Sequence, residues 1–213
     1  MKFEELLSLI GDEPVFETGL LLAGDVDPAE VHRQLSRWVK VGRLLQLRRG
    51  LYSLAAPFRK KYPHPFLVAN RLVPGSYVSL QSALAQSALI PEYVPVTTSV
   101  TVGRPRRWKT PLGYFDFRHL RDQLFVGFRK TLLVGSQEAL IATPEKALLD
   151  LVYLEPDGDS MEYLTELRLQ NMDGLDVQEL SHLAEALGKP KLRRAAARIA
   201  CLAETEAREY QTL

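Results

Sequence analysis

The chain has 213 residues, of which 46% are hydrophobic and 25% are charged, and its formal net charge is +1. This composition is ordinary for a folded protein, and the length allows one large domain or two small ones. The single cysteine, Cys201, excludes a disulfide within the chain and fits a reducing cytoplasm. The first residues carry acids where a secretory signal carries bases, and the uncharged run 72–91 contains polar residues and prolines. We therefore expect a soluble cytoplasmic protein without a membrane span.

Charge is unevenly distributed along the chain. Residues 1–30 contain eight acids and one base, residues 31–115 contain 14 Lys or Arg and one acid, and residues 116–213 contain 17 acids and 12 bases. A long basic segment inside a nearly neutral protein is typical of a surface that binds a polyanion. The alternative is that acids elsewhere in the chain fold back onto this segment and neutralise it.

Three helices are predicted at the N-terminus. Residues 2–10 place apolar side chains at helical spacing, and residues 14–25 predict a short second helix that ends near Gly24. Residues 27–41 predict a third helix with one apolar stripe. The ends of this helix are marked by residues with strong capping preferences, which are Asp27, Pro28, Glu30 and Gly42.

A β-hairpin is predicted directly after the third helix. Residues 43–47 and 51–54 have strand character, and Arg48, Arg49 and Gly50 connect them as a three-residue loop with glycine in the left-handed position. Leucines in both runs would hold the hairpin against the helices. The order of three helices followed by a hairpin is the pattern of a winged helix-turn-helix domain, which we assign to residues 1–58.

The rest of the chain mixes helices and strands. Residues 56–65 are rich in proline and basic residues and predict a linker. Helices are expected over residues 65–73, 80–89, 143–154, 161–170, 176–187 and 190–210, and strands over residues 94–103, 113–120, 124–134 and 136–143. The sequence thus predicts an α+β protein, in which residues 64–213 form a mixed α+β domain with a helical C-terminal tail.

The polar face of the third helix favours DNA binding. Arg33, Arg37 and Lys40 recur at the spacing of one exposed face, with Gln34 and Ser36 on its flanks. Arginine can bind guanine and glutamine can bind adenine in a major groove, and the remaining bases can hold phosphates. A solvated basic helix is the alternative. The hairpin adds Arg43 at its base and Arg48 and Arg49 at its tip, where they are expected to face the DNA backbone or the minor groove.

A second basic cluster surrounds Trp108. Its members are Arg104, Arg106, Arg107 and Lys109, and prolines on both sides predict a loop between strands. This loop is a second candidate contact with nucleic acid or with a partner. A solvated loop with Trp108 folded onto the domain is the alternative.

No residue spacing in the chain is typical of a catalytic or metal site. The chain contains no glycine-rich phosphate loop and no His-Glu-x-x-His motif, and its four histidines are far apart. Ser79 is expected to cap a helix, and Cys201 is expected to be a small core residue. We therefore assign no catalytic residue, no metal ligand and no cofactor.

Several segments together resemble the AbiEi-type antitoxin regulators of bacterial toxin–antitoxin and abortive-infection systems. The similar segments are WVKVGRLLQLRRGLYSL, VPGSYVSLQSALAQSALIP, TPLGYFDF and ATPEKALLDLVY, which occur in the family's order over about residues 1–155. The resemblance implies a winged helix that binds inverted repeats in the chain's own promoter, through basic residues that match here at Arg33, Arg37, Lys40, Arg48 and Arg49. It also implies a cognate nucleotidyltransferase-like toxin, which is counteracted without a stable contact being required. The segment after Tyr153 is short and acidic, so the antitoxic part is expected to differ from larger members.

The sequence therefore predicts a DNA-binding antitoxin and autorepressor that is not an enzyme. One alternative is a stand-alone winged-helix regulator whose second domain senses a ligand or mediates oligomerisation. Another is an enzyme fused to a DNA-reading module.

Overall fold

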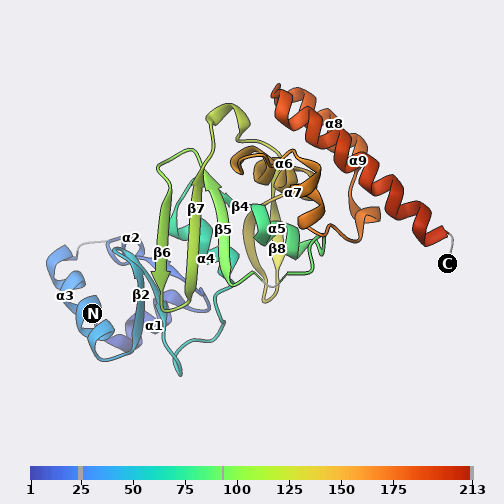
Figure 1. Cartoon of the computed structure of the whole chain (residues 1–213). Helices are drawn as coiled ribbons and strands as arrows, with labels where there is room; N and C mark the ends of the chain where they lie inside the picture. The colour runs from blue at the N-terminus through green and yellow to red at the C-terminus, as the bar shows by residue number, and fades with distance from the viewer. Residues whose placement is uncertain (24–25, 93, 212–213) are drawn as a thin grey trace.

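The computed structural model describes residues 1–23, 26–92 and 94–211 and shows an α+β protein (Figure 1). A small three-stranded sheet with its helices lies at one end of the molecule, a six-stranded sheet lies in the middle, and the C-terminal helices lie at the other end. The α+β class predicted from the sequence is confirmed.

The N-terminal part is built from short elements around a small core. In chain order these are α1 (Phe3–Ile10), β1 (Phe16–Glu17), α2 (Thr18–Leu21), α3 (Pro28–Lys40), β2 (Leu44–Arg48) and β3 (Leu51–Leu54). The three strands are antiparallel in the order β1-β3-β2. The strand β1 was not predicted, and the expected end of the second helix near Gly24 lies outside the described residues.

The caps of α3 explain where this helix begins and ends. The Asp27 side chain accepts a hydrogen bond from the backbone N–H of Ala29 at 2.9 Å, as predicted for an N-cap. Gly42 follows the helix with a φ of +72°, which a residue without a Cβ adopts readily. Glu30 differs from the expected capping box, because its carboxylate accepts hydrogen bonds from Arg33 and Gln34 along the helix.

The larger part is built on a mixed six-stranded sheet. Its first elements are α4 (Pro65–Leu72), β4 (Ser76–Val78), α5 (Leu80–Gln86), β5 (Val96–Thr101), β6 (Arg106–Thr110), β7 (Gly113–His119), β8 (Phe128–Leu133) and β9 (Gln137–Ala142). The strand order is β6-β7-β5-β4-β9-β8, so β6 and β8 are the two edges. The pairs β5–β7 and β4–β9 are parallel, and the other neighbours are antiparallel.

Helices complete the larger part, as predicted. They are α6 (Pro144–Leu154), α7 (Met161–Glu166), α8 (Val177–Ala186) and α9 (Pro190–Gln211), with short 3-10 turns at Asp122–Leu124 and Met172–Gly174. The helix α6 begins at the expected cap, since the Thr143 hydroxyl accepts from the backbone N–H of Lys146. In Figure 1, α9 runs beside α8, and its C-terminal end lies at the end of the molecule opposite α3. No helix among the described residues is long and apolar enough to span a membrane.

Five further features of the structure differ from what the sequence predicted. The basic segment around Trp108 is the edge strand β6 and not a loop, and β4 was not predicted. Ser79 precedes α5, but its hydroxyl donates to Asp150 and makes no cap hydrogen bond. Cys201 is exposed and not a core residue, because it lies on the outer face of α9. The hairpin connection is a two-residue turn, since Arg48 ends β2 and the strand pairing contains a bulge between Gln46 and Arg48.

The two parts share buried contacts. The smaller core contains only residues from the first 58 positions, including Leu35 and Trp38. Three other N-terminal residues, Val15, Leu47 and Leu51, pack instead into the core of the six-stranded sheet. The hairpin therefore has one face in each core.

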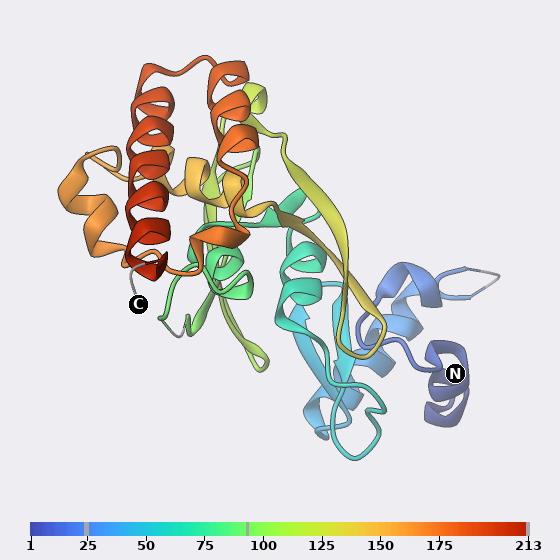
Figure 2. The same ribbon diagram turned by 90° about the vertical axis from the view of Figure 1, so that its right-hand side faces the viewer.

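The segment between the two parts is held by a side chain from the sheet. The buried Gln137 accepts a hydrogen bond from the backbone N–H of His64 at 2.8 Å and donates one to the carbonyl of Tyr62 at 2.9 Å. Figure 2 shows the β8–β9 hairpin that carries Gln137 reaching down beside the N-terminal part. The predicted linker, residues 56–65, is thus held near its C-terminal end by two hydrogen bonds from one side chain.

Candidate nucleic-acid interface

The exposed face of α3 carries the cations that the sequence predicted there. Val31, Leu35 and Trp38 are buried on the opposite face, which fixes the helix on the small core. Ser36, Arg37 and Lys40 are exposed, and among the described residues their side chains have no hydrogen-bond or ion-pair partner. Figure 1 shows α3 at the end of the molecule away from the six-stranded sheet, so this face is not covered by the larger part.

The first turn of α3 is partly neutralised by its own acids. Arg33 Nη2 lies 2.7 Å from Glu30 Oε2 and 3.8 Å from Asp27 Oδ2, and Gln34 Nε2 donates to Glu30 Oε1 at 2.8 Å. The hydrogen bonds from Gln34 and then from Arg33 lower the pKa of the Glu30 carboxyl below its ordinary value. Arg37 and Lys40 in the last turn are consequently the cations of α3 without an acidic partner in the described chain.

Arg43 continues the basic surface beyond α3. Its side chain is exposed, and its guanidinium carbon lies 4.8 Å from the centroid of the Phe3 ring and 6.0 Å from that of Phe58. Cation–π contacts of this kind hold the guanidinium in place while leaving its N–H groups free to bind an anion. Arg43 follows Lys40 closely in the chain and lies next to Arg37 around a small surface hollow.

Arg48 lies elsewhere than expected, because it faces the larger part of the protein. Its side chain is only 23% exposed, and Nη2 lies 3.5 Å from Glu17 Oε1 and donates to the carbonyl of Arg71 at the end of α4 at 3.1 Å. Its Nη1 donates to the carbonyl of Arg49, and its Nε is buried without a partner among the described residues. Arg48 therefore joins the hairpin to α4 and is not oriented toward solvent.

Arg49 remains available at the hairpin tip. It is exposed, and its side chain has no partner within the described part of the chain. The neighbouring turn is held against the start of α2, since the carbonyl of Gly50 accepts a hydrogen bond from the N–H of Thr18 at 2.9 Å. The arginine pair of the tip is thus divided, with one side chain turned inward and one outward.

The second basic cluster is not part of the α3 surface. Its four cations are all exposed, and β6 lies on the side of the three-stranded sheet opposite α3 (Figure 1). Arg107 Nε lies 3.3 Å from Asp116 Oδ1, and Lys109 lies over the ring of Tyr114. The indole of Trp108 packs against the larger core, and its buried Nε1 has no partner among the residues that the structure describes.

A buried polar cluster was not predicted as a unit. Lys146 and Asp150 on α6 form an ion pair, and Asp150 Oδ2 accepts hydrogen bonds from Tyr77 at 2.9 Å and Ser79 at 2.8 Å. All four side chains are buried, so the cluster joins β4, α5 and α6 inside the core. The signal that could have indicated it was the i, i+4 spacing of Lys146 and Asp150 on an otherwise apolar helix.

Comparisons with known proteins add no family assignment. A scan of the chain against protein-family models gives no match, and a search of curated proteins also gives none.

Proposed function

We propose that the protein is a DNA-binding transcriptional regulator whose N-terminal part is a winged helix-turn-helix, with α3 in the major groove. The observation that carries this proposal is the exposed row of Ser36, Arg37 and Lys40 on a helix whose other face is fixed in a core. The row continues into Arg43, and a helix of this width fits the major groove of B-form DNA. Exposed cations without acidic partners are the groups that phosphates and guanine bases attract.

The order of elements supports the same proposal. A helix, a short strand, two further helices and an antiparallel hairpin follow one another, and the first strand pairs with the hairpin. In this arrangement the third helix is presented at the surface and the hairpin lies beside it. At the tip of the hairpin we assign the DNA contact to Arg49, because Arg48 is held by α4 and Glu17.

The biological role that we propose is that of an antitoxin and repressor of its own operon, counteracting a nucleotidyltransferase-like toxin. This part of the proposal is supported by the resemblance of the ordered motifs to AbiEi-type regulators. A nucleotidyltransferase-like protein encoded beside the gene should arrest bacterial growth when it is expressed alone. Co-expression of the present chain with it should restore growth. Growth arrest that persists despite full antitoxin expression would contradict the role.

The DNA proposal is tested by a binding titration against the region upstream of the protein's own gene. Arg37→Ala with Lys40→Ala should weaken binding, and the slope of log K against log salt should become shallower by about 1 for each phosphate that the variant no longer neutralises. Arg129→Ala with Lys130→Ala is the matched control, because both are exposed cations on β8, the far edge of the larger sheet. Equal affinity of the two double variants would contradict the proposal.

A stand-alone regulator with a ligand-sensing second domain is the second candidate. It is favoured by a cavity of about 800 Å³ on the six-stranded sheet, lined in part by β6. Dissociation from DNA on addition of a small molecule would favour this candidate over the antitoxin.

A further inference from the structure

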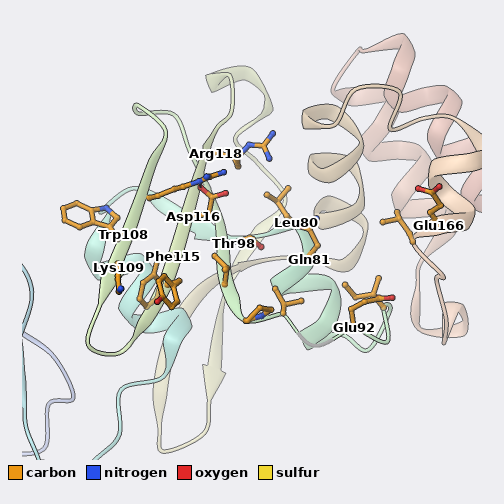
Figure 3. Close-up of a pocket in the computed structure, with 17 residues that line it drawn as sticks. Leu80, Gln81, Glu92, Thr98, Trp108, Lys109, Phe115, Asp116, Arg118 and Glu166 are labelled. Carbon is orange, nitrogen blue, oxygen red and sulfur yellow. The ribbon is translucent and has the colours of Figure 1, made fainter.

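The cavity lies over the half of the six-stranded sheet formed by β6, β7 and β5 (Figure 3). Its volume of about 800 Å³ is within the range of small-molecule sites. The floor of the cavity is one face of the sheet. The strand register aligns two rows of side chains on this face, each running from the edge strand β6 across β7 to β5. One row is Lys109, Tyr114 and Val96, and the other is Arg107, Asp116 and Thr98.

Polarity changes along both rows. The edge strand β6 contributes two cations, the middle strand contributes an exposed tyrosine and a half-buried aspartate, and β5 contributes a valine and a threonine. The Thr98 hydroxyl is already used, because it donates to the carbonyl of Ser79 at 2.7 Å and accepts from the N–H of Ser82 at 3.0 Å. The inner floor of the cavity is thus effectively apolar.

The wall beyond β5 is apolar as well. It is formed by Leu80 at the start of α5, by Ile90, Val94 and Pro95 after α5 and by Leu167 after α7. Glu92 and Glu166 stand at the rim on this side, and Glu92 is paired with Arg168. Glu92 and Glu166 therefore stand across an apolar interior from the two cations of β6, whereas Asp116 and Arg118 line the cavity from the middle strand, β7.

The two cations of β6 retain free hydrogen-bond donors. Among the described residues Lys109 Nζ has no hydrogen-bond or ion-pair partner, and it lies 5.6 Å from the Tyr114 ring centroid. Arg107 is paired with Asp116 through Nε, at 3.3 Å. Because residues two apart on a strand lie on the same face about 7 Å apart, both heads can approach one anionic group.

We infer that this cavity binds a small amphiphilic anion, with its acidic group at Lys109 and Arg107 and its apolar body against Leu80, Val96 and Leu167. The charge of the head group is complementary to the edge strand, and the apolar body is complementary to the interior. The inference concerns the larger part of the chain and does not depend on DNA binding.

Two fluorescent probes of almost the same shape test the inference. The first is 1-anilinonaphthalene-8-sulfonate, which carries an anionic group, and the second is N-phenyl-1-naphthylamine, which lacks it. The full chain should bind the sulfonate with one-to-one stoichiometry and at least about tenfold more tightly than the neutral probe, because charge-assisted hydrogen bonds contribute only to the first. Decanoate should displace the sulfonate.

Variants locate the head group. Arg107→Met with Lys109→Met should weaken sulfonate binding at least about tenfold and leave binding of the neutral probe unchanged. Lys109→Met alone should show part of the loss. Because this single variant keeps the Arg107–Asp116 pair intact, it tests the inference even if the double variant is poorly folded. The matched control is Arg129→Met with Lys130→Met on β8, the opposite edge of the same sheet, which should bind like the parent.

Three results would overturn the inference. These are equal affinity for the two probes, sulfonate binding that Lys109→Met leaves unchanged, and weakening by the β8 control equal to that of the β6 variant.

Discussion

Lys146 and Asp150 show how a charged pair can be held inside an apolar core. Both side chains are buried, and Asp150 is further bound by the hydroxyls of Tyr77 and Ser79. Burial raises the pKa of the Asp150 carboxyl, and the adjacent Lys146 opposes this effect. Burial lowers the pKa of the Lys146 ammonium, and the attraction of Asp150 opposes it in turn. Each group is therefore tolerated because the other is present.

Removing one partner should cost more than removing both charges. Lys146→Met should lower the free energy of unfolding by about 3–5 kcal/mol, because it leaves the Asp150 carboxyl buried without its counter-ion. Lys146→Met with Asp150→Asn should recover part of this loss, since a neutral amide can still accept a hydrogen bond from a hydroxyl. Urea denaturation followed by circular dichroism measures both values.

The exposed pair Lys130–Glu138 is the control for this cycle. Its side chains are well exposed, and Lys130→Met should leave the urea midpoint close to that of the parent. A double variant at Lys146 and Asp150 that is less stable than Lys146→Met would contradict the interdependence of the buried pair.

At the scale of elements, the β2–β3 hairpin connects two surfaces with different roles. Leu47 and Leu51 pack into the larger core, and Arg48 binds the carbonyl at the end of α4. The hairpin also follows α3 directly in the chain, and the N–H of Arg43 at its base donates to the carbonyl of Trp38 on α3 at 2.9 Å. The hairpin therefore contacts both α3 and the larger part of the protein.

The two arginines of the hairpin tip should respond differently to substitution. Arg48→Ala should lower the free energy of unfolding by about 1–3 kcal/mol, because the carbonyl of Arg71 and the carboxylate of Glu17 lose a charged donor. Arg49→Ala should leave stability unchanged and weaken DNA binding. Thermal unfolding and a DNA titration on the same samples separate the effects. Weaker DNA binding by Arg48→Ala without loss of stability would show that Arg48 contacts DNA directly.

Sequence patterns predicted the elements whose determinants are local. The helix α3 was predicted because its cap, its apolar stripe and its terminal glycine all lie within residues 27–42. The strand β6 was not, because its five residues are mostly charged and become a strand only by pairing with β7. The orientation of Arg48 was not predictable either, since its acceptor on α4 is 23 residues away in sequence.

The same distinction applies to the candidate sites. The cationic row on α3 follows from helical periodicity alone. The structure adds only that the side chains of Arg33 and Gln34 donate hydrogen bonds to the Glu30 carboxylate. The cavity over β6, β7 and β5 needs strand register, which places Lys109 beside Tyr114 and Val96. No local pattern in the sequence contains that register.

At the scale of the whole molecule, the two cores are not independent. Val15, Leu47 and Leu51 belong to the N-terminal part and are buried in the core of the six-stranded sheet. Unfolding either part would expose these side chains. The boundary predicted between residues 58 and 64 is therefore a boundary in sequence that buried contacts cross.

The two tryptophans should report one unfolding transition. Trp38 lies in the smaller core and Trp108 packs against the larger one, so Trp108→Phe and Trp38→Phe variants give each part its own fluorescent probe. In each variant, the remaining tryptophan and the far-ultraviolet circular dichroism should show the same urea midpoint, because the shared contacts couple the parts. Separate midpoints for the two signals in either variant would show that the parts unfold independently.

The carboxamide of Gln137 makes the segment between the two cores visible to hydrogen exchange. The amide hydrogen of His64 is bound to Gln137 Oε1, whereas an amide in a solvated tether exchanges freely with water. Because the same side chain also binds the carbonyl of Tyr62, the amide of His64 can exchange only when the β8–β9 hairpin releases the chain. The exchange rate of this one amide thus reports how often the segment before α4 detaches from the β8–β9 hairpin.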